Sequence, residues 1–141
     1  MSEPESIAHV QEAITGLVRT VPGVRGVLLA TRDGHPVTHH LPADSDQAKA
    51  RPTAAMIAAL LGIGNQLSEL TGDPELLEAT VRSPAGSVVI YAVGSRAVMT
   101  VLTDETVNLA RLNHEARRRV DGLAELIEAM PRASVPYEAA S

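Results

Sequence analysis

The chain has 141 residues and a formal net charge of −5, the size of one domain. It has no Cys, Phe or Trp, and Tyr91 and Tyr137 are its aromatic residues. Without cysteine, disulfides and thiolate metal sites are excluded. The negative charge and the scarcity of aromatic rings argue against a nucleic-acid partner. We therefore expect an aliphatic core and no nucleic-acid binding.

The first residues are acidic and lack the basic start and apolar run of a signal peptide. The longest largely apolar stretch, residues 54–64, is too short to span a bilayer. We expect a cytoplasmic protein with no direct membrane insertion.

In chain order, the first predicted element is a helix over residues 7–21, where apolar residues recur every three or four positions. Residues 2–5 precede it with capping-box spacing, and Pro22-Gly23 ends it. A hairpin over residues 24–41 follows, turning at Asp33-Gly34. Its second strand begins with proline, which suits the edge of a sheet.

A second helix is predicted from Pro52 to about Leu70, and it is apolar on two faces. One face is a stripe of large side chains: Met56, Leu60, Ile63, Leu67 and Leu70. The other, called here the small-residue strip, consists of Ala55, Ala58, Ala59 and Gly62. Because small side chains let a second backbone approach closely, this strip is expected to pack on a partner.

Three strands are predicted at residues 76–83, 88–93 and 96–102. A long last helix, capped by Thr103-Asp104, is expected to run to about residue 130. The domain is therefore placed at residues 1–130, and residues 131–141 are expected to be a disordered tail.

The order is helix, two strands, helix, three strands, helix. Every link between consecutive strands is tight, so the strands pair antiparallel and the class is α+β. We expect one five-stranded antiparallel sheet with helices on both faces. The simplest closure pairs residues 24–31 with 96–102, which leaves 35–41 and 76–83 as the edges.

This order, together with particular residues, resembles the roadblock (dynein light-chain roadblock) family over residues 7–130. The matching stretches are Val21-Pro22-Gly23-Val24, residues 27–34, the alanine-rich second helix, and residues 91–97 and 108–118. One departure is Ala110, where last helices of the family often have glycine.

The resemblance implies a homodimer in which the second helices pack on each other and the third strands join edge to edge. It also implies a non-catalytic role as scaffold, regulator or activating protein beside a small Ras-like GTPase. Bacterial relatives often act with a sensor-kinase-like protein as well.

The predicted dimer interface combines the small-residue strip with one face of the third strand. Its residues are Ala55, Ala58, Ala59, Gly62, Glu78, Thr80 and Arg82. Two alternatives stay open. For the small-residue strip, another part of the same chain could cover it. For the strand, the polar residues could protect an exposed edge, or Glu78 could pair with Arg82 across a two-fold axis.

No catalytic, cofactor or metal site is predicted. His39 and His40 are adjacent on a strand and point to opposite faces, so they cannot hold one ion together. The run Arg117-Arg118-Arg119 points in three directions on a helix and is expected on a solvated face. Arg32, Arg51 and Arg82 are further exposed candidates for an arginine that assists GTP hydrolysis in a partner, and the sequence does not select among them. The rival functions are a PAS- or GAF-like small-molecule sensor and an enzyme whose site leaves no motif.

Overall fold

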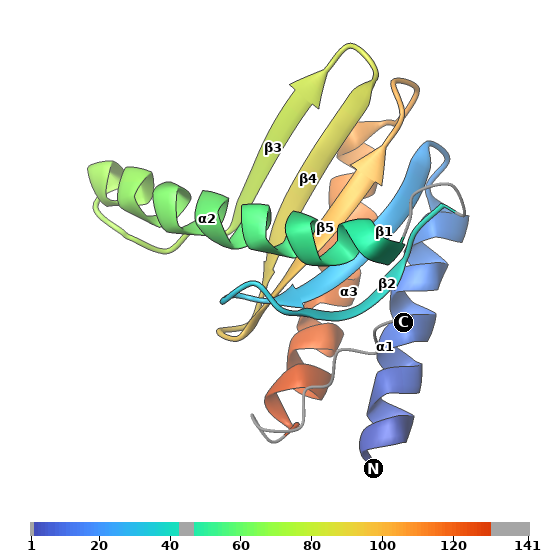
Figure 1. The fold of residues 1–141 in the computed structure, drawn as a ribbon. Helices are drawn as coiled ribbons and strands as arrows, with labels where there is room; N and C mark the ends of the chain where they lie inside the picture. The colour runs from blue at the N-terminus through green and yellow to red at the C-terminus, as the bar shows by residue number, and fades with distance from the viewer. Residues whose placement is uncertain (1, 43–46, 131–141) are drawn as a thin grey trace.

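The computed structural model of the protein describes residues 2–42 and 47–130 (Figure 1). The helices are α1 (Glu3–Thr20), α2 (Ala50–Ser68) and α3 (Leu109–Glu128), with short 3-10 turns η1 (Gln47–Lys49) and η2 (Glu69–Thr71) at the two ends of α2. The strands are β1 (Val24–Thr31), β2 (Pro36–His40), β3 (Glu78–Ser83), β4 (Gly86–Val93) and β5 (Ala97–Thr103). The predicted tail at residues 131–141 lies outside the described residues.

All five strands form one antiparallel sheet in the order β2-β1-β5-β4-β3. The predicted closure of β1 on β5 is confirmed, with Leu28 opposite Thr100. The two predicted edge strands are also confirmed as β2 and β3. Tight turns explain the pairings within β1-β2 and within β3-β4-β5, and the pairing of β1 with β5 joins these two groups into one sheet.

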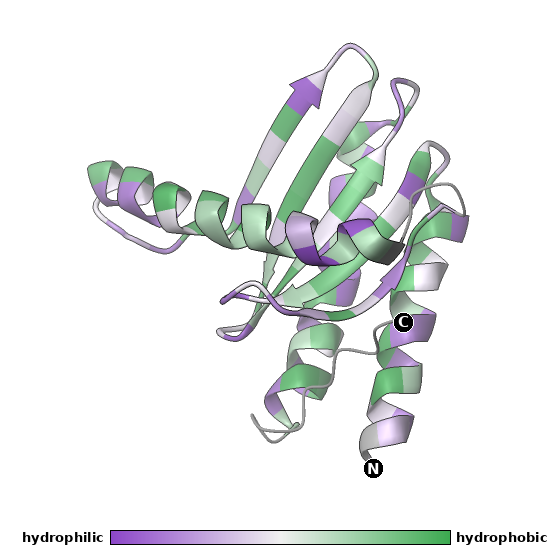
Figure 2. Cartoon of the chain, viewed as in Figure 1, coloured by the Kyte–Doolittle hydropathy of each residue, from purple (hydrophilic) through white to green (hydrophobic). Residues whose placement is uncertain are grey.

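Helices α1 and α3 lie side by side on one face of the sheet, and α2 crosses the other (Figure 1). The core beneath α1 and α3 is the larger, with Leu17, Tyr91 and Leu123 among its buried side chains. The core beneath α2 is thinner, and α2 contributes to it only Ala50, Ala54, Ile57 and Leu61 as buried residues. The hydropathy colouring shows further apolar residues on the outer side of α2 (Figure 2).

The start of α1 agrees with the capping prediction, because Ser2 is the N-cap and its Oγ accepts the Glu5 N–H at 3.3 Å. The helix ends before Pro22-Gly23. Gly23 has a φ of +93°, and a Cβ there would lie 2.8 Å from the Cα of Val107. Glycine is therefore required where the chain leaves α1 beside the loop between β5 and α3.

The predicted cap of the last helix was wrong. Helix α3 begins at Leu109, and its N-cap is Asn108, whose side chain accepts the Arg111 N–H at 3.0 Å. Asp104 instead organises the loop before the helix, accepting the Thr106 N–H at 2.8 Å and the Thr106 hydroxyl at 2.6 Å. These hydrogen bonds lower the pKa of Asp104. Asp and Asn side chains both hydrogen-bond to nearby backbone N–H groups, so residue type alone does not separate a turn residue from the helix cap.

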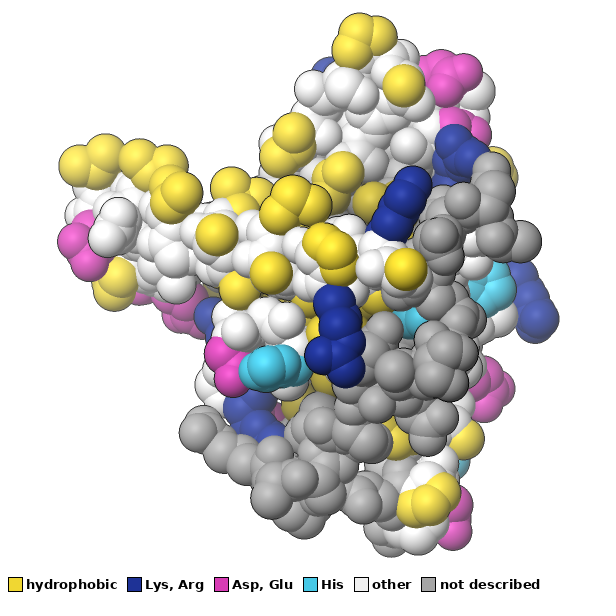
Figure 3. All heavy atoms as spheres, in the orientation of Figure 1, with side chains coloured by type: hydrophobic (Ala, Val, Ile, Leu, Met, Phe, Trp, Pro, Cys, Tyr) yellow, Lys and Arg dark blue, Asp and Glu magenta, His cyan; other side chains and the backbone are white. Residues whose placement is uncertain are grey.

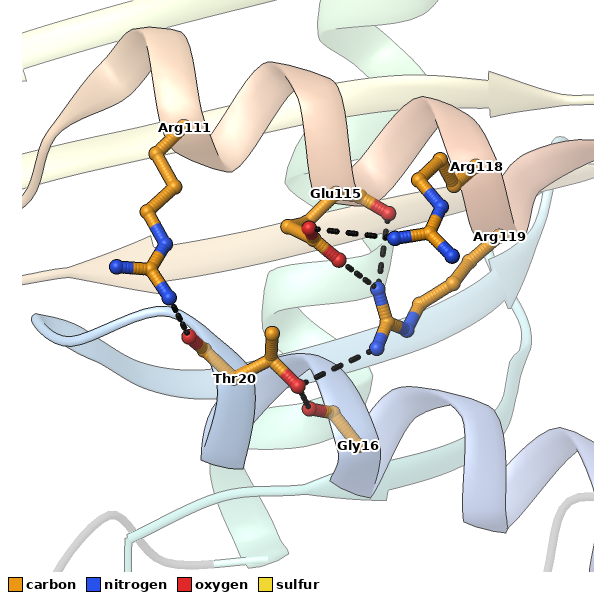
Figure 4. A network of polar contacts seen from close by, with 6 residues as sticks. All are labelled: Gly16, Thr20, Arg111, Glu115, Arg118 and Arg119. Atoms are coloured by element: carbon orange, nitrogen blue, oxygen red, sulfur yellow. Dashed lines mark hydrogen bonds and ion pairs between the residues drawn. The ribbon is translucent and has the colours of Figure 1, made fainter.

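A polar network joins the end of α1 to α3 (Figure 4). The Thr20 hydroxyl donates to the Gly16 carbonyl at 2.7 Å, while Arg111 donates to the Thr20 carbonyl at 2.9 Å. Arg119 reaches the Thr20 hydroxyl at 3.4 Å and the Glu115 carboxylate at 2.9 Å, and its hydrogen bond lowers the pKa of Glu115. Arg119 is thus packed between two helices, which corrects the expectation that the whole arginine run is solvated.

No helix among the described residues is long and apolar enough to cross a membrane.

Candidate protein-interaction surface

The outer side of α2 and the strand β3 form an apolar surface. Of the described residues, every large hydrophobic side chain that is exposed lies here. We call this the α2/β3 surface, and its large apolar members are Met56, Ile63, Leu67, Leu70, Leu77 and Val81. Exposed fractions run from 52% at Val81 to 84% at Leu70. This concentration makes the surface a candidate interaction site, because single exposed hydrophobic residues are normally scattered.

The space-filling view shows hydrophobic side chains along α2 and over the neighbouring side of the sheet (Figure 3). Between the carboxyl-terminal half of α2 and the start of β3 lies an apolar groove of about 370 Å³. It is lined by Leu60, Ile63, Gly64, Leu67, Ser68, Thr71, Leu76 and Ala79. The groove lies between the helix and the strand and is part of the α2/β3 surface.

Two contacts hold α2 beside the segment that leads into β3. The Leu76 N–H donates to Oδ1 of Asn65 at 3.1 Å. The Leu76 side chain also lies directly on the helix at Gly64, where an added Cβ would be 2.6 Å from Cδ2 of Leu76. The helix and the edge strand are therefore presented together to any partner.

Strand β3 is one of the two edge strands of the sheet, and its residues are half-buried at Glu78 and Ala79 and exposed from Thr80 to Ser83. Glu78 points to the face covered by α3, where its carboxylate is 2.5 Å from Arg117. Tyr91 lies opposite Glu78 on β4, and its hydroxyl donates to Asn113 at 2.5 Å. Burial, and secondly the charge of Glu78, raise the pKa of Tyr91. Tyr91 therefore stays a neutral hydrogen-bond donor inside the fold.

The structure divides the small-residue strip. Ala55, Ala59 and Gly62 are exposed, and a Cβ added at Gly62 would meet nothing within 4 Å. Ala58 is half-buried, because the hairpin turn at Gly34 packs against it, with a Cβ at Gly34 only 3.4 Å from that of Ala58. Part of the strip thus has an intrachain role, while Thr80 and Arg82 on β3 are exposed.

Sequence reasoning missed that the large apolar stripe of α2 faces outward. The sheet-facing side is Ala50, Ala54, Ile57 and Leu61, which has the same three- and four-residue spacing. Because α2 is apolar on almost every side, periodicity could not choose the buried face. The abundance of apolar residues all round the helix was the available signal that packing on the sheet leaves part of its apolar surface exposed.

The other candidate residues lie apart from this surface. His40 on β2 is 3.4 Å from the Thr15 hydroxyl of α1, while His39 points to the face of α2, which confirms that they diverge. Arg32 is half-buried and donates to the Gly94 carbonyl at 2.8 Å. Within the described part of the chain, no three His, Asp or Glu side chains come together as a metal site.

The model of the Roadblock/LC7 domain matches residues 10–103, more than half of the chain. The chain belongs to the Roadblock/LC7 family. The match includes α2, β3 and the groove between them, and it ends where the loop before α3 begins. No individual curated protein matches this Roadblock/LC7 domain in sequence.

Solved structures extend the similarity to α3. The gliding protein MglB of Thermus thermophilus matches with a TM-score of 0.79 and 20% identity, over 92% of this chain and 95% of that one. A Roadblock/LC7 domain of Streptomyces avermitilis matches with a TM-score of 0.76 and 22% identity, over 84% and 97%. An MglB described in a tetrameric arrangement gives 0.80 and 19%, over 87% and 90%. At these identities the matches show that the Roadblock/LC7 fold is shared.

Proposed function

We propose that this Roadblock/LC7 domain is a homodimeric, non-catalytic regulator or scaffold that binds a small Ras-like GTPase. The observation that carries the proposal is the α2/β3 surface, an exposed apolar helix face beside an open edge strand. A second copy of the chain offers the same two elements, so one two-fold contact covers both.

The homodimer would bury the apolar side chains of α2 that do not pack on the sheet. Ala59 and Gly62 are exposed beside the stripe of large apolar side chains, and their small size lets a second α2 approach closely. On β3, Glu78 and Arg82 lie on one face and are symmetric about Thr80. Antiparallel pairing of two β3 strands about an axis at Thr80 places each Glu78 opposite the partner's Arg82.

The GTPase partner rests on family membership, because the roadblock resemblance implies small Ras-like GTPases as partners. The gliding protein MglB of Thermus thermophilus and the MglB of Myxococcus xanthus share the fold, which supports the role of regulator or scaffold proposed for this chain. The catalytic chemistry of hydrolysis is left to the GTPase in this proposal. A sensor-kinase-like protein is the further partner that the bacterial relatives imply.

The dimer is tested by sedimentation velocity of Ala59→Arg, with Ala8→Arg as the matched control at an exposed alanine of α1. The α2 variant should sediment as a smaller species than the wild type, because an arginine blocks close helix packing. The control should keep the wild-type state. If both variants keep it, the dimer interface lies elsewhere.

The edge-strand register is tested by Arg82→Glu, which places two acidic side chains opposite each other at each Glu78 and should weaken the dimer. The matched control is Arg25→Glu, an exposed arginine on β1 rather than on the β3 edge. Equal association by Arg82→Glu and wild type would rule out this register.

The partner is tested by a pull-down from native cytosol loaded in parallel with GDP or a non-hydrolysable GTP analogue. A small GTPase enriched in either state supports the proposal, and the preferred state separates a regulator from a scaffold. If no GTPase is retained and native mass spectrometry finds a small molecule on the purified protein, the PAS- or GAF-like sensor replaces it.

A further inference from the structure

The outward side of α3 carries a row of charged side chains and no large apolar residue. We call it the α3 ridge, and its members are Arg111, His114, Arg118, Asp121, Glu125 and Glu128, all exposed. At about 100° per residue, the ridge points directly away from the buried stripe of the same helix. That stripe is Leu112, Ala116, Leu123 and Ile127.

The charges of the ridge run against the helix dipole. Its basic members stand in the amino-terminal half of α3 and its acidic members in the carboxyl-terminal half. The first turn has no acidic residue and the last turn no basic one. Such an order disfavours the helix, since a dipole prefers acids at its start and bases at its end.

The acidic members of the ridge also repel one another. Asp121 and Glu125 are both acidic and four residues apart, and Glu125 and Glu128 are three apart. Like charges at these spacings face each other on a helix and destabilise it. An opposing surface of the reverse charge order would convert this cost into attraction.

Turned antiparallel, the ridge of a second copy of the chain presents the reverse charge order. The ridge contains three pairs of one basic and one acidic position: Arg111 and Glu128, His114 and Glu125, and Arg118 and Asp121. Every pair shares one midpoint, between Arg119 and Val120, as a two-fold axis across antiparallel helices requires. All three basic positions then face acidic ones.

Contacts within the chain hold the ridge in place. Arg111 donates to the Thr20 carbonyl at 2.9 Å, and Glu128 accepts from the Ser95 hydroxyl at 2.9 Å. Arg118 is 3.5 Å from Glu115, yet its side chain remains 65% exposed. The network of Figure 4 fixes the rotation of α3 against α1, so the ridge keeps facing outward.

We propose that the α3 ridge is a self-docking surface, on which a second copy of the chain packs its own α3 antiparallel. In this contact Arg118 faces the partner's Asp121 and His114 faces the partner's Glu125. The ridge is on the opposite face of the sheet from α2, so it operates independently of the α2/β3 dimer and links such dimers into larger assemblies.

The contact is expected to be weak and sensitive to salt, because exposed ion pairs are individually small and are screened by electrolyte. Where α2/β3 dimers form, each offers two ridges, and paired contacts strengthen the assembly. The expected behaviour is association that depends on both protein concentration and ionic strength.

Sedimentation velocity of the full chain at about 50 mM and about 500 mM NaCl tests the proposal. At low salt the wild type should form species twice the mass of its high-salt form. Asp121→Arg places arginines opposite each other at two symmetric positions and should lower the association constant by about tenfold or more. The swap Arg118→Asp with Asp121→Arg keeps the pairing complementary and should restore association.

The rescue separates docking from helix stability, which circular dichroism of each variant monitors. Repeating the same variants in the Ala59→Arg background separates ridge docking from the α2/β3 dimer. In that background, Asp121→Arg should still weaken association and the swap should still restore it. The proposal is overturned if the wild type shows no salt-dependent association, if Asp121→Arg associates as the wild type does, or if the swap fails to restore association while remaining helical.

Discussion

Asn65 on α2 accepts the backbone N–H of Leu76 at 3.1 Å. This hydrogen bond joins an exposed apolar helix to the segment that enters the edge strand β3. The two elements are separated in sequence by the 3-10 turn η2 and an exposed loop. The amide side chain of Asn65 is therefore one of the contacts that fix the geometry of the α2/β3 surface.

Asn65→Ala is expected to leave the Leu76 N–H without its partner in a partly buried position and to lower the free energy of unfolding by about 1–2 kcal/mol. Urea unfolding measures this loss. Gln66→Ala, at the exposed neighbouring position, should change stability by less than about 0.5 kcal/mol. Equal stability of Asn65→Ala and Gln66→Ala would show that the hydrogen bond does not fasten the segment.

Gly62→Ala should reveal whether another helix packs closely on α2. Gly62 and Gly122 are both exposed helical glycines, and a Cβ added at either would meet nothing within 4 Å. Replacing glycine by alanine in a helix gains about 0.5–1 kcal/mol. Thermal unfolding should show this gain for Gly122→Ala and a smaller gain, or none, for Gly62→Ala, where a new methyl group meets the partner helix. Equal gains would argue against close packing at Gly62.

Stability should fall on mild acidification because of His39. Burial, and secondly the charge of His40, lower the pKa of His39, so the folded state favours the neutral ring. The unfolded chain then binds more protons, and stability is lost as pH falls below about 6.5 through the lowered folded value. Urea unfolding between about pH 7 and pH 5 should show a shallower pH dependence for His39→Gln than for the wild type.

The control for that experiment is His9→Gln, which removes an imidazole from an exposed position on α1. A His39→Gln profile that runs parallel to the wild type would remove His39 as the source of the pH dependence.

Tyr91→Phe is expected to destabilise the fold by about 1–2 kcal/mol, because it leaves the Asn113 acceptor without the buried hydroxyl that donates to it. The ring itself still fills its place between β4 and α3. Urea unfolding measures the loss, and sedimentation velocity should show an unchanged oligomeric state. A variant as stable as the wild type would mean that water replaces the hydroxyl.

The sequence alone determined the order of elements and the class of fold. Tight turns at Asp33-Gly34 and Gly94-Ser95 permit only antiparallel neighbours, and the simplest way to join the two groups of strands was the one that the structure adopts. The family resemblance was also available from residues spread along the chain, and the Roadblock/LC7 match confirms it.

The tertiary structure decided which faces are covered. Ile57 and Met56 are adjacent and both apolar, yet the first is buried between α2 and the sheet and the second is 64% exposed. Periodicity cannot separate them, because burial depends on how far α2 rotates against the sheet. That rotation is set by contacts distant in sequence, such as Gly34 against Ala58. The rotation of α3 decides in the same way that Arg119 packs between α1 and α3 while Arg118 is exposed to solvent.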